Sequence, residues 1–335
     1  MINPQDKFLI IYHKEDNDGL FSMAIIYNYL VNDMHIKPEN IHRLGADYKD
    51  MNVISSVKKN GKTELDKILD TYQHIVMTDI SFNDFAAIKK IYKKLGHEFV
   101  WIDHHAPIIK QSVREKLDEI PGVRDTTRSA ILNAYKYTYD PFDELYNNRN
   151  HKIELFRILS AFDSWSYEQE GYTKDYAFSV NTGVINAFQL DPEKIIKFVN
   201  GVLQSADQRE YISRFEKEGS EFNRNYYNKN HKIVEDYAEI WNLKFIDKTA
   251  LVIFQSGQTS SMWFEPFADK ADCGLVFKHL NDGSWGVSLY NTSDDSDFHC
   301  GNYLKEHYGG GGHAGAAGCQ LTQDQFIEIL KNKTL

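Results

Sequence analysis

The sequence predicts an α/β protein of two domains: a parallel-sheet domain, a long helical connection and a smaller C-terminal α/β domain. In the first part of the chain, short apolar runs alternate with stretches of helical periodicity, which indicates a parallel sheet with helices on both faces. A charged, glycine-poor and helically periodic stretch follows, and β-rich runs return after it. The length of 335 residues also suits two domains better than one. We expect domains at 1–190 and 238–335, joined by a helical linker at 191–237.

The elements of the first domain follow from the spacing of its apolar residues. The predicted strands are Lys7–Tyr12, His74–Thr78 and Glu98–Ile102, and the predicted helices are Gly19–Val31 and Asn83–Leu95. Each strand is a short apolar run, as expected for strands that are buried on both faces. The helices show apolar side chains three or four residues apart.

The second domain follows the stretch 191–237, which we predict to form one or two long helices. Its predicted strands are Ala250–Phe254, Cys273–His279 and Ser284–Tyr290. Together with the helical segments between and after them, they predict a small α/β domain.

Composition excludes several classes of protein. Hydrophobic residues make up 42% of the chain and the formal net charge is −10, so we expect a folded protein without a basic surface for long nucleic acids. Three widely spaced cysteines favour a reducing compartment over a disulfide framework. No signal peptide and no apolar run of about 20 residues is present, so we expect a cytoplasmic protein that does not contact a membrane.

Acidic and imidazole residues follow each of the three predicted strands in the first domain. In chain order they are His13, Asp16 and Asp18, then Asp79, then Asp103, His104 and His105. Because ligands of open parallel sheets bind at the carboxyl ends of the strands, these side chains can converge on one crevice. A mixed set of carboxylates and imidazoles is typical of a site for a metal such as Mn²⁺, whereas a structural zinc site would more often use cysteine thiolates.

A structural explanation competes with this one. A single aspartate after a strand is usually the N-cap of the next helix, and paired histidines are commonly surface residues. Acidic or imidazole residues follow all three successive predicted strands, and this repetition favours a metal site over three separate helix caps. Asp163 adds a fourth acidic position, flanked by Phe162 and Trp165, where an unpaired carboxylate would be costly without a cation.

These residues resemble the DHH family of phosphoesterases. The triplet Asp103-His104-His105 after an apolar strand is the motif that gives the family its name, and the other acidic positions follow its motifs in order. The glycine-rich Gly309–Gly318 resembles the signature of the associated DHHA1 domain. With both ends matched, the resemblance covers nearly the whole chain and implies an active site in the cleft between a DHH and a DHHA1 domain.

The resemblance implies two Mn²⁺ ions, with Mg²⁺ or Co²⁺ as substitutes. His13 and Asp16 would bind the first ion, Asp18, His104 and Asp163 the second, and Asp79 both. His105 would face the substrate phosphate, and Asp103 would orient a histidine or touch a metal. The family usually has one or three residues between its first histidine and the next aspartate, whereas Lys14 and Glu15 make two here. Glu15 is therefore an alternative to Asp16 as a ligand.

The substrate is expected to contact both domains. The candidate substrate-binding residues are Arg128, Ser129, Ser288, Asn291, Gly310, Gly311, Gly312 and His313. Glycines let backbone N–H groups approach a phosphate, although a flexible surface loop is the plainer interpretation of the same segment. The start of a helix capped by Thr126 or Thr127 explains Arg128 and Ser129 equally well. Many family members have arginine where this chain has Tyr290, which favours stacking on a base or ribose.

The compact layout looks most like the nanoRNases of the family. We therefore expect a Mn²⁺-dependent phosphodiesterase that releases mononucleotides from short oligoribonucleotides or dinucleotides. The alternatives are a phosphatase for 3′-phosphoadenosine 5′-phosphate, a cyclic-mononucleotide phosphodiesterase and a nucleotide-binding sensor without catalysis. We expect no long nucleic acid as partner, and a homodimer remains open.

Overall fold

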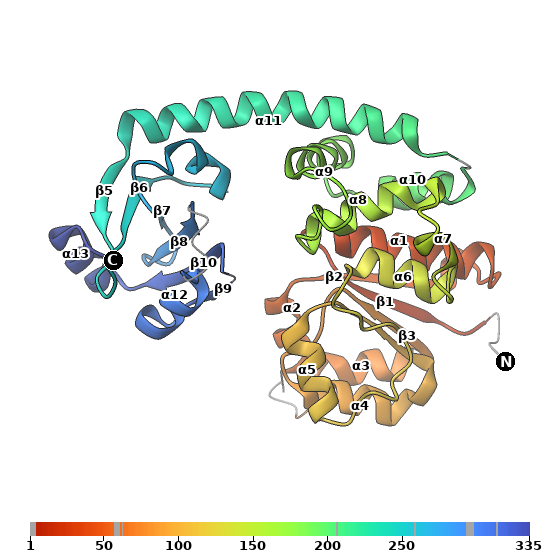
Figure 1. The fold of residues 1–335 in the computed structure, drawn as a ribbon. Helices are drawn as coiled ribbons and strands as arrows, with labels where there is room; N and C mark the ends of the chain where they lie inside the picture. The colour runs from red at the N-terminus through yellow and green to blue at the C-terminus, as the bar shows by residue number, and fades with distance from the viewer. Residues whose placement is uncertain are drawn as a thin grey trace. The chain divides into compact units, whose positions relative to one another are not determined.

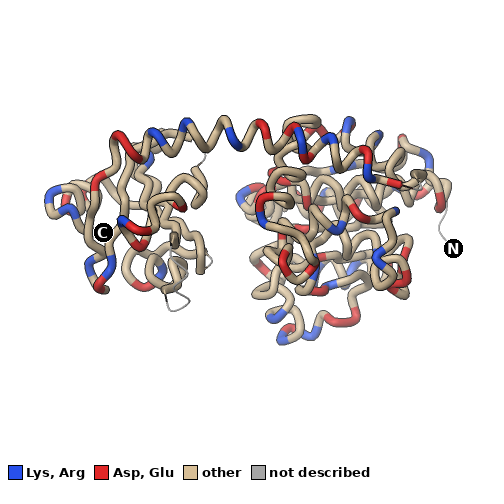
Figure 2. The backbone as a smooth tube through the Cα atoms, turned by 45° about the horizontal axis from the view of Figure 1, so that its top comes forward, with Lys and Arg blue, Asp and Glu red and all other residues tan. Residues whose placement is uncertain are grey.

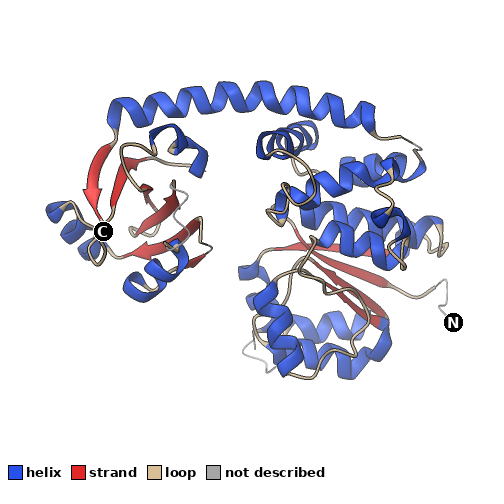
Figure 3. Cartoon of the chain, in the orientation of Figure 1, coloured by secondary structure: helices blue, strands red, loops and turns tan. Residues whose placement is uncertain are grey.

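The protein consists of two compact units, Met1–Phe222 and Asn223–Leu335 (Figure 1). The computed structural model describes residues 5–56, 61, 63–205, 207–257, 259–292, 298–312 and 314–335. Each unit combines a β-sheet with helices, as Figure 3 shows by colour. The predicted fold class, an N-terminal parallel-sheet region followed by a smaller α/β region, is confirmed.

The first unit alternates strands and helices as the sequence predicts. Its strands are β1 (Phe8–His13), β2 (Ile41–Ala46), β3 (His74–Thr78) and β4 (Phe99–Ile102). Its α-helices are α1 (Asn17–Asn32), α2 (Tyr48–Ser55), α3 (Glu64–Thr71), α4 (Phe85–Leu95), α5 (Ala106–Arg114), α6 (Ala130–Thr138), α7 (Glu144–Asn147), α8 (Glu154–Asp163), α9 (Lys174–Phe188), α10 (Pro192–Gln204) and the first part of α11 (Arg209–Tyr237). Short 3₁₀ turns lie at Pro38–Asn40, Gly96–Glu98 and His151–Ile153.

The four strands form a parallel sheet in the order β2-β1-β3-β4. Side chains alternate between two cores: Phe8 and Ile10 pack with α1, α6 and α8, whereas Leu9 and Ile11 pack with α2, α3 and α4 on the opposite face (Figure 1). β1 and β3 are neighbours at the centre of the sheet and both are almost completely buried. Their carboxyl ends therefore meet where a parallel sheet binds its ligands.

β2 is absent from the sequence-based prediction. It lies at the edge of the sheet, and only its two terminal residues, Ile41 and Ala46, are fully buried. Its segment IHRLGA has neither an apolar run nor strict alternation, because an edge strand needs less apolar surface than a central one.

The helical stretch after residue 190 divides into two helices. α10 contributes Ile195, Val199 and Val202 to the core of the first unit, so this stretch is part of that unit and the predicted linker begins too early. α11 begins in the first unit and ends in the second. No helix in the described part of the chain is both long and apolar enough to cross a bilayer.

The second unit is built on a six-stranded sheet of order β5-β6-β7-β8-β10-β9, in which only β6 and β7 pair in parallel. Its strands are β5 (Glu239–Asn242), β6 (Thr249–Phe254), β7 (Cys273–His279), β8 (Trp285–Asn291), β9 (Gly311–Gly312) and β10 (Ala316–Leu321), and its later α-helices are α12 (Cys300–Tyr308) and α13 (Gln323–Asn332). The predicted glycine-rich segment is thus largely a strand pair. Short strands without apolar runs, such as β5 and β9, leave little signal in the sequence.

Two helices of the first unit meet at glycines. A Cβ atom on Gly183 of α9 would lie 2.0 Å from the carbonyl oxygen of Phe215 in α11, and one on Gly219 of α11 would lie 1.8 Å from that of Ser179 in α9. Both distances are far below van der Waals contact. The two helix backbones can therefore approach closely only because neither glycine has a side chain.

We expect Gly183→Ala and Gly219→Ala to destabilise the first unit by about 1–3 kcal/mol each, the usual cost of overpacking. The matched control is Gly201→Ala in α10, where a Cβ would meet no atom within 4 Å. Because alanine favours a helix over glycine, this control should instead stabilise by about 0.5–1 kcal/mol. Urea unfolding checks all three; equal effects in the three variants would contradict the close helix contact.

Candidate metal centre

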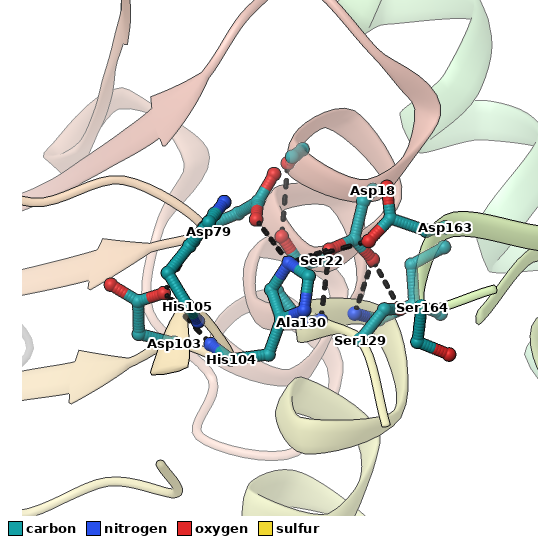
Figure 4. Close-up of polar contacts among 12 residues, drawn as sticks. Asp18, Ser22, Asp79, Asp103, His104, His105, Ser129, Ala130, Asp163 and Ser164 are labelled. Atoms are coloured by element: carbon teal, nitrogen blue, oxygen red, sulfur yellow. Dashed lines mark hydrogen bonds and ion pairs between the residues drawn. The ribbon is translucent and has the colours of Figure 1, made fainter. Parts of the chain in front are cut away.

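Polar side chains from four parts of the first unit meet at the carboxyl ends of β1, β3 and β4. Three groups have ligand atoms within 4.8 Å of one another: His13, Asp16 and Asp79; Asp18, His104 and Asp163; and Asp79, His104 and His105. Figure 4 shows the ring of His104 between Asp79 on one side and Asp18 with Asp163 on the other. The structure thus brings together all six residues that the sequence predicts as metal ligands.

The first group lies at the end of β1. His13 Nδ1 lies 2.8 Å from Asp16 Oδ2 and 3.7 Å from Asp79 Oδ2. Asp16 also caps α1, because its Oδ1 accepts a hydrogen bond from the N–H of Gly19. The capping and metal-binding interpretations of Asp16 are therefore compatible. Glu15 is exposed and belongs to none of the three groups, so the alternative ligand is not supported.

The second group surrounds one nitrogen of His104. Nε2 lies 3.5 Å from Asp18 Oδ2, 3.3 Å from Asp79 Oδ1 and 3.3 Å from Asp163 Oδ2. Asp18 is in the first turn of α1, and Asp163 is the last residue of α8. Three carboxylates around one imidazole nitrogen form a strongly negative site that suits a divalent cation.

The start of α6 holds Asp18 in place. The backbone N–H groups of Ala130 and Ile131 each donate to its carboxylate at 2.8 Å, and the hydroxyl of Ser129 donates as well (Figure 4). The positive end of a helix dipole favours a negative charge at this point. The expectation that Ser129 binds substrate is wrong, since its side chain is fully buried behind Asp18. Its role is to orient that carboxylate.

Asp79 lies between the two metal-ligand groups: its Oδ2 is 3.7 Å from His13 Nδ1 of the first group, and its Oδ1 is 3.3 Å from His104 Nε2 of the second. It is 2% exposed, and its Oδ1 has no hydrogen-bond partner although it is buried. Its backbone has a φ of 58°, in the left-handed region that aspartate and asparagine tolerate better than most residues. A buried carboxylate oxygen without a donor is stabilised by a proton or a cation, so the residues present fit a divalent metal, to which Asp79 would be a ligand.

The charges of this cluster perturb one another strongly. Burial, together with the charge of Asp18, raises the pKa of both Asp79 and Asp163 well above the ordinary range of an aspartate. Burial alone would lower the pKa of His13, but its hydrogen bond to Asp16 and the nearby carboxylate of Asp79 outweigh burial and raise the pKa to about 10. Without metal, the site therefore retains protons that a bound cation would displace.

Asp103 and His105 form a separate pair beside the metal ligands. Oδ1 of Asp103 accepts from His105 Nδ1 at 2.8 Å and from the backbone N–H groups of His104 and His105. Oδ2 accepts from Trp101 Nε1 at 3.2 Å. Asp103 is 1% exposed and occurs in none of the metal groups, so it is a positioning residue for His105. The bond to Nδ1 leaves Nε2 of His105 free to face a substrate.

Several predicted substrate-binding residues have other partners in the structure. The guanidinium of Arg128 pairs with Asp143 at 2.7 Å and lies over the ring of Tyr146. Asn291 donates to the carbonyl of Phe298 and lies on the opposite side of β8 from Ser288, which follows from the alternation of a strand. Arg128 and Asn291 are thus held within their own units.

The predicted glycines differ in their roles. Gly310 and Gly312 are required for packing, because a Cβ on either would lie within 2.6 Å of a carbonyl oxygen of β10. Gly311 has open space where a Cβ would be, so packing does not explain it. His313 lies outside the described residues. Gly311 and Ser288 remain predicted substrate contacts.

Tyr48 is a neighbour of the site that the sequence analysis missed. Its ring lies 6.0 Å from that of His13, and burial together with the charges of Asp103, Asp79 and Asp16 raises the pKa of its hydroxyl. The phenol therefore stays a hydrogen-bond donor at the edge of the cluster. Most of the other site residues were found because they follow predicted strands. Tyr48 follows the edge strand β2, which was not predicted, so its position at the end of a strand could not be recognised.

Residues 7–149 match the model of the DHH family, N-terminal domain. The first unit contains a DHH domain. The family resemblance predicted from the sequence is confirmed for these residues. The match ends before Asp163 and the second unit, so the DHHA1 assignment of that unit stays a prediction. No curated protein sequence matches the chain.

Solved structures share the fold of the DHH chain at low sequence identity. The DHH domain of a member of a ribosomal-protein family is 14% identical, with a TM-score of 0.62 over 98% of this chain and 86% of that one. RecJ of Thermus thermophilus in complex with Mn²⁺ is 12% identical, with a TM-score of 0.54 over 98% of this chain and 51% of RecJ. The pGpG-specific phosphodiesterase PggH of Vibrio cholerae is 13% identical, with a TM-score of 0.50 over 97% and 96% of the two chains. At these identities the likeness concerns the fold.

We expect Asp79→Asn to remove metal-dependent stabilisation and to lower phosphoesterase activity by more than about 100-fold, beyond the usual effect of an outer-sphere residue. Asparagine keeps the left-handed backbone and removes only the charge. Mn²⁺ at about 100 times its Kd should stabilise the wild type by about 2.7 kcal/mol, a rise in Tm on the order of 5–10 °C. Asp79→Asn should lose that rise without a lower metal-free Tm.

The control for Asp79→Asn is Asp84→Asn. Asp84 is exposed and caps α4 through the N–H of Ala86, a role that asparagine fills equally well. It makes the same change of charge five residues further along the chain. A full Mn²⁺-dependent rise in Tm in Asp79→Asn would contradict the shared-ligand assignment.

Metal binding should strengthen as the pH rises. The pKa values of Asp79, Asp163 and His13 are all raised, so these groups hold protons at a pH where isolated aspartates and histidines would have lost them. Since a ligand must lose its proton and the pKa of His13 is raised to about 10, release of that proton alone should lower the apparent Kd for Mn²⁺ by about tenfold per pH unit between about pH 6 and pH 8. Calorimetry in two buffers of different ionisation enthalpy measures the proton release. A pH-independent Kd would contradict the assignment.

Proposed function

We propose that the protein is a two-metal phosphodiesterase that hydrolyses short oligoribonucleotides or dinucleotides to mononucleotides, with Mn²⁺ as its cofactor. The observation that supports this most directly is the pair of three-residue ligand groups, the second of which Asp79 of the first reaches through its 3.3 Å contact with His104. Two cations held by a common carboxylate are the arrangement that phosphoryl-transfer enzymes use to bind both the attacking and the leaving oxygen.

The chain supplies three functions around the reacting phosphate. When bound, divalent ions lower the pKa of a coordinated water and neutralise charge on the phosphoryl oxygens. Asp79 would link the two ligand groups, and the start of α6 would keep Asp18 oriented. His105 would contribute Nε2. Burial opposes its charge, but Asp103 raises the pKa of the imidazole, so Nε2–H can donate to a phosphoryl or leaving oxygen.

The distribution of charge supports a short substrate. Basic and acidic positions are interspersed along the described trace of each unit (Figure 2), and the formal net charge is −10. A long strand needs many phosphate contacts along a positive groove, whereas a dinucleotide needs only the local positive charge of a metal pair. The shared fold with RecJ and with a pGpG-specific phosphodiesterase supports phosphodiester chemistry.

The test is a rate comparison on purified protein with Mn²⁺. The substrates are di- to pentaribonucleotides, 3′-phosphoadenosine 5′-phosphate and a 3′,5′-cyclic mononucleotide. We expect the highest kcat/KM on the oligoribonucleotides. Higher kcat/KM on either single nucleotide would replace the proposal with the corresponding alternative, and binding without turnover would indicate a sensor.

His105→Ala should lower kcat by about 10²- to 10⁴-fold, the range of general acid–base catalysis. Mn²⁺ affinity should change much less, because Asp79 and His104 keep their other partners. His97→Ala, which removes an exposed histidine from the same unit, is the control. Loss of Mn²⁺ binding in His105→Ala would instead identify this residue as a metal ligand.

A further inference from the structure

Trp165 has an unfavourable backbone conformation at the end of α8. Its φ is 56°, in the left-handed region, although it is not a glycine. Its N–H donates to the carbonyl of Phe162 and the N–H of Ser166 donates to that of Ala161. These two bonds define a Schellman motif, in which the residue at the position of Trp165 is usually glycine.

Burial does not explain why a tryptophan occupies this position. The side chain of Trp165 is 58% exposed, so a large aromatic ring lies in water at a position where glycine would remove the backbone strain. Residues kept in such conformations cluster at functional sites. Trp165 therefore calls for an explanation other than stability.

Trp165 closely follows a metal-ligand candidate in the chain. Asp163, two residues earlier, is the last residue of α8 and reaches His104 Nε2 at 3.3 Å. Ser164 is the single residue between the metal-ligand candidate and Trp165. The indole is also braced, since its centroid lies 5.9 Å from that of Phe178 in a T-shaped arrangement and 6.4 Å from that of Tyr167. It thus presents an ordered aromatic surface.

We propose that Trp165 is a stacking platform for the base of the nucleotide whose phosphate lies at the metal centre. The inference rests on the proposed function and extends it to the recognition of the base. An exposed indole can stack on every base, because each base has a π-face, and such stacking requires no particular sequence. A braced ring also loses little conformational freedom when a base binds.

The discriminating variants are Trp165→Gly and Trp165→Phe. Glycine removes the ring and suits the left-handed backbone, so folding should be retained; phenylalanine keeps an aromatic face. The substrates are a diribonucleotide and the same phosphodiester without its bases. For the diribonucleotide, Trp165→Gly should raise KM by about tenfold, within the range for loss of one stacked base, and Trp165→Phe should raise it less.

The base-free substrate supplies the decisive comparison. Trp165→Gly should leave its kcat/KM and the Mn²⁺ affinity unchanged, because neither depends on stacking. Phe142→Ala, which removes a ring that is 81% exposed in the same unit, is the control and should affect neither substrate. Equal losses on both substrates, or a fall in Tm that accounts for the loss, would overturn the proposal in favour of a structural role.

A binding measurement separates this proposal from the proposed function. A dinucleotide should quench the fluorescence of Trp165, and the quenching should be smaller in Trp165→Phe. If the wild type hydrolyses nothing but still shows this quenching, the proposed function fails and the stacking platform stands. If the Trp165 variants hydrolyse the dinucleotide with unchanged KM and unchanged quenching, the proposed function stands and the stacking platform fails. The exposed ring would then be explained as a docking surface for a protein.

Discussion

Repulsion among closely spaced carboxylates is the constraint on which the rest of this site depends. Asp16, Asp18, Asp79 and Asp163 lie around two imidazoles at one edge of the sheet. The scaffold donates hydrogen bonds to two of them: His13 and an N–H group to Asp16, and the start of α6 to Asp18. Asp79 and Asp163 share a single imidazole nitrogen, Nε2 of His104, at 3.3 Å each. Asp79 keeps a buried oxygen without a hydrogen bond. The fold thus offsets part of the repulsion in the acidic cluster, and a bound cation would offset the rest.

The metal ligands could be predicted from the sequence because their signals are local and their meeting point follows from topology. His13, Asp79 and His104 each follow an apolar run, and parallel strands place their carboxyl ends at one edge of the sheet. The same logic located β1 and β3 at the centre of the sheet and β4 at one edge, which is also mostly buried. It failed for β2 at the other edge, which is half-exposed and interrupted by polar residues, because the apolar pattern reflects burial and β2 is buried less.

The partners of the ligands could not be predicted in this way. Ser129 orients Asp18, which lies 111 residues earlier in the chain, and no local pattern encodes that hydrogen bond. Arg128 was predicted to bind substrate because its segment resembles one near the family's active site, yet its guanidinium pairs with Asp143 inside the unit. Asn291 was predicted from its neighbourhood, and the alternation of β8 places it on the opposite side from Ser288. Residue type indicates chemistry, but only tertiary packing decides which groups remain free.

One strained backbone position lies within this cluster and another lies two residues after one of its members, and they point to a site that is largely formed before a cation binds. Asp79 has a φ of 58° at the end of β3, and Trp165 has a φ of 56° just after Asp163. Each conformation costs free energy that the surrounding sheet and helices offset. Because the strain is already present in the fold, cation binding would not have to create it, and the ligands would need little reorganisation. The free energy of cation binding can then be used to relieve the repulsion around Asp79, which explains why metal affinity and proton release should be closely coupled.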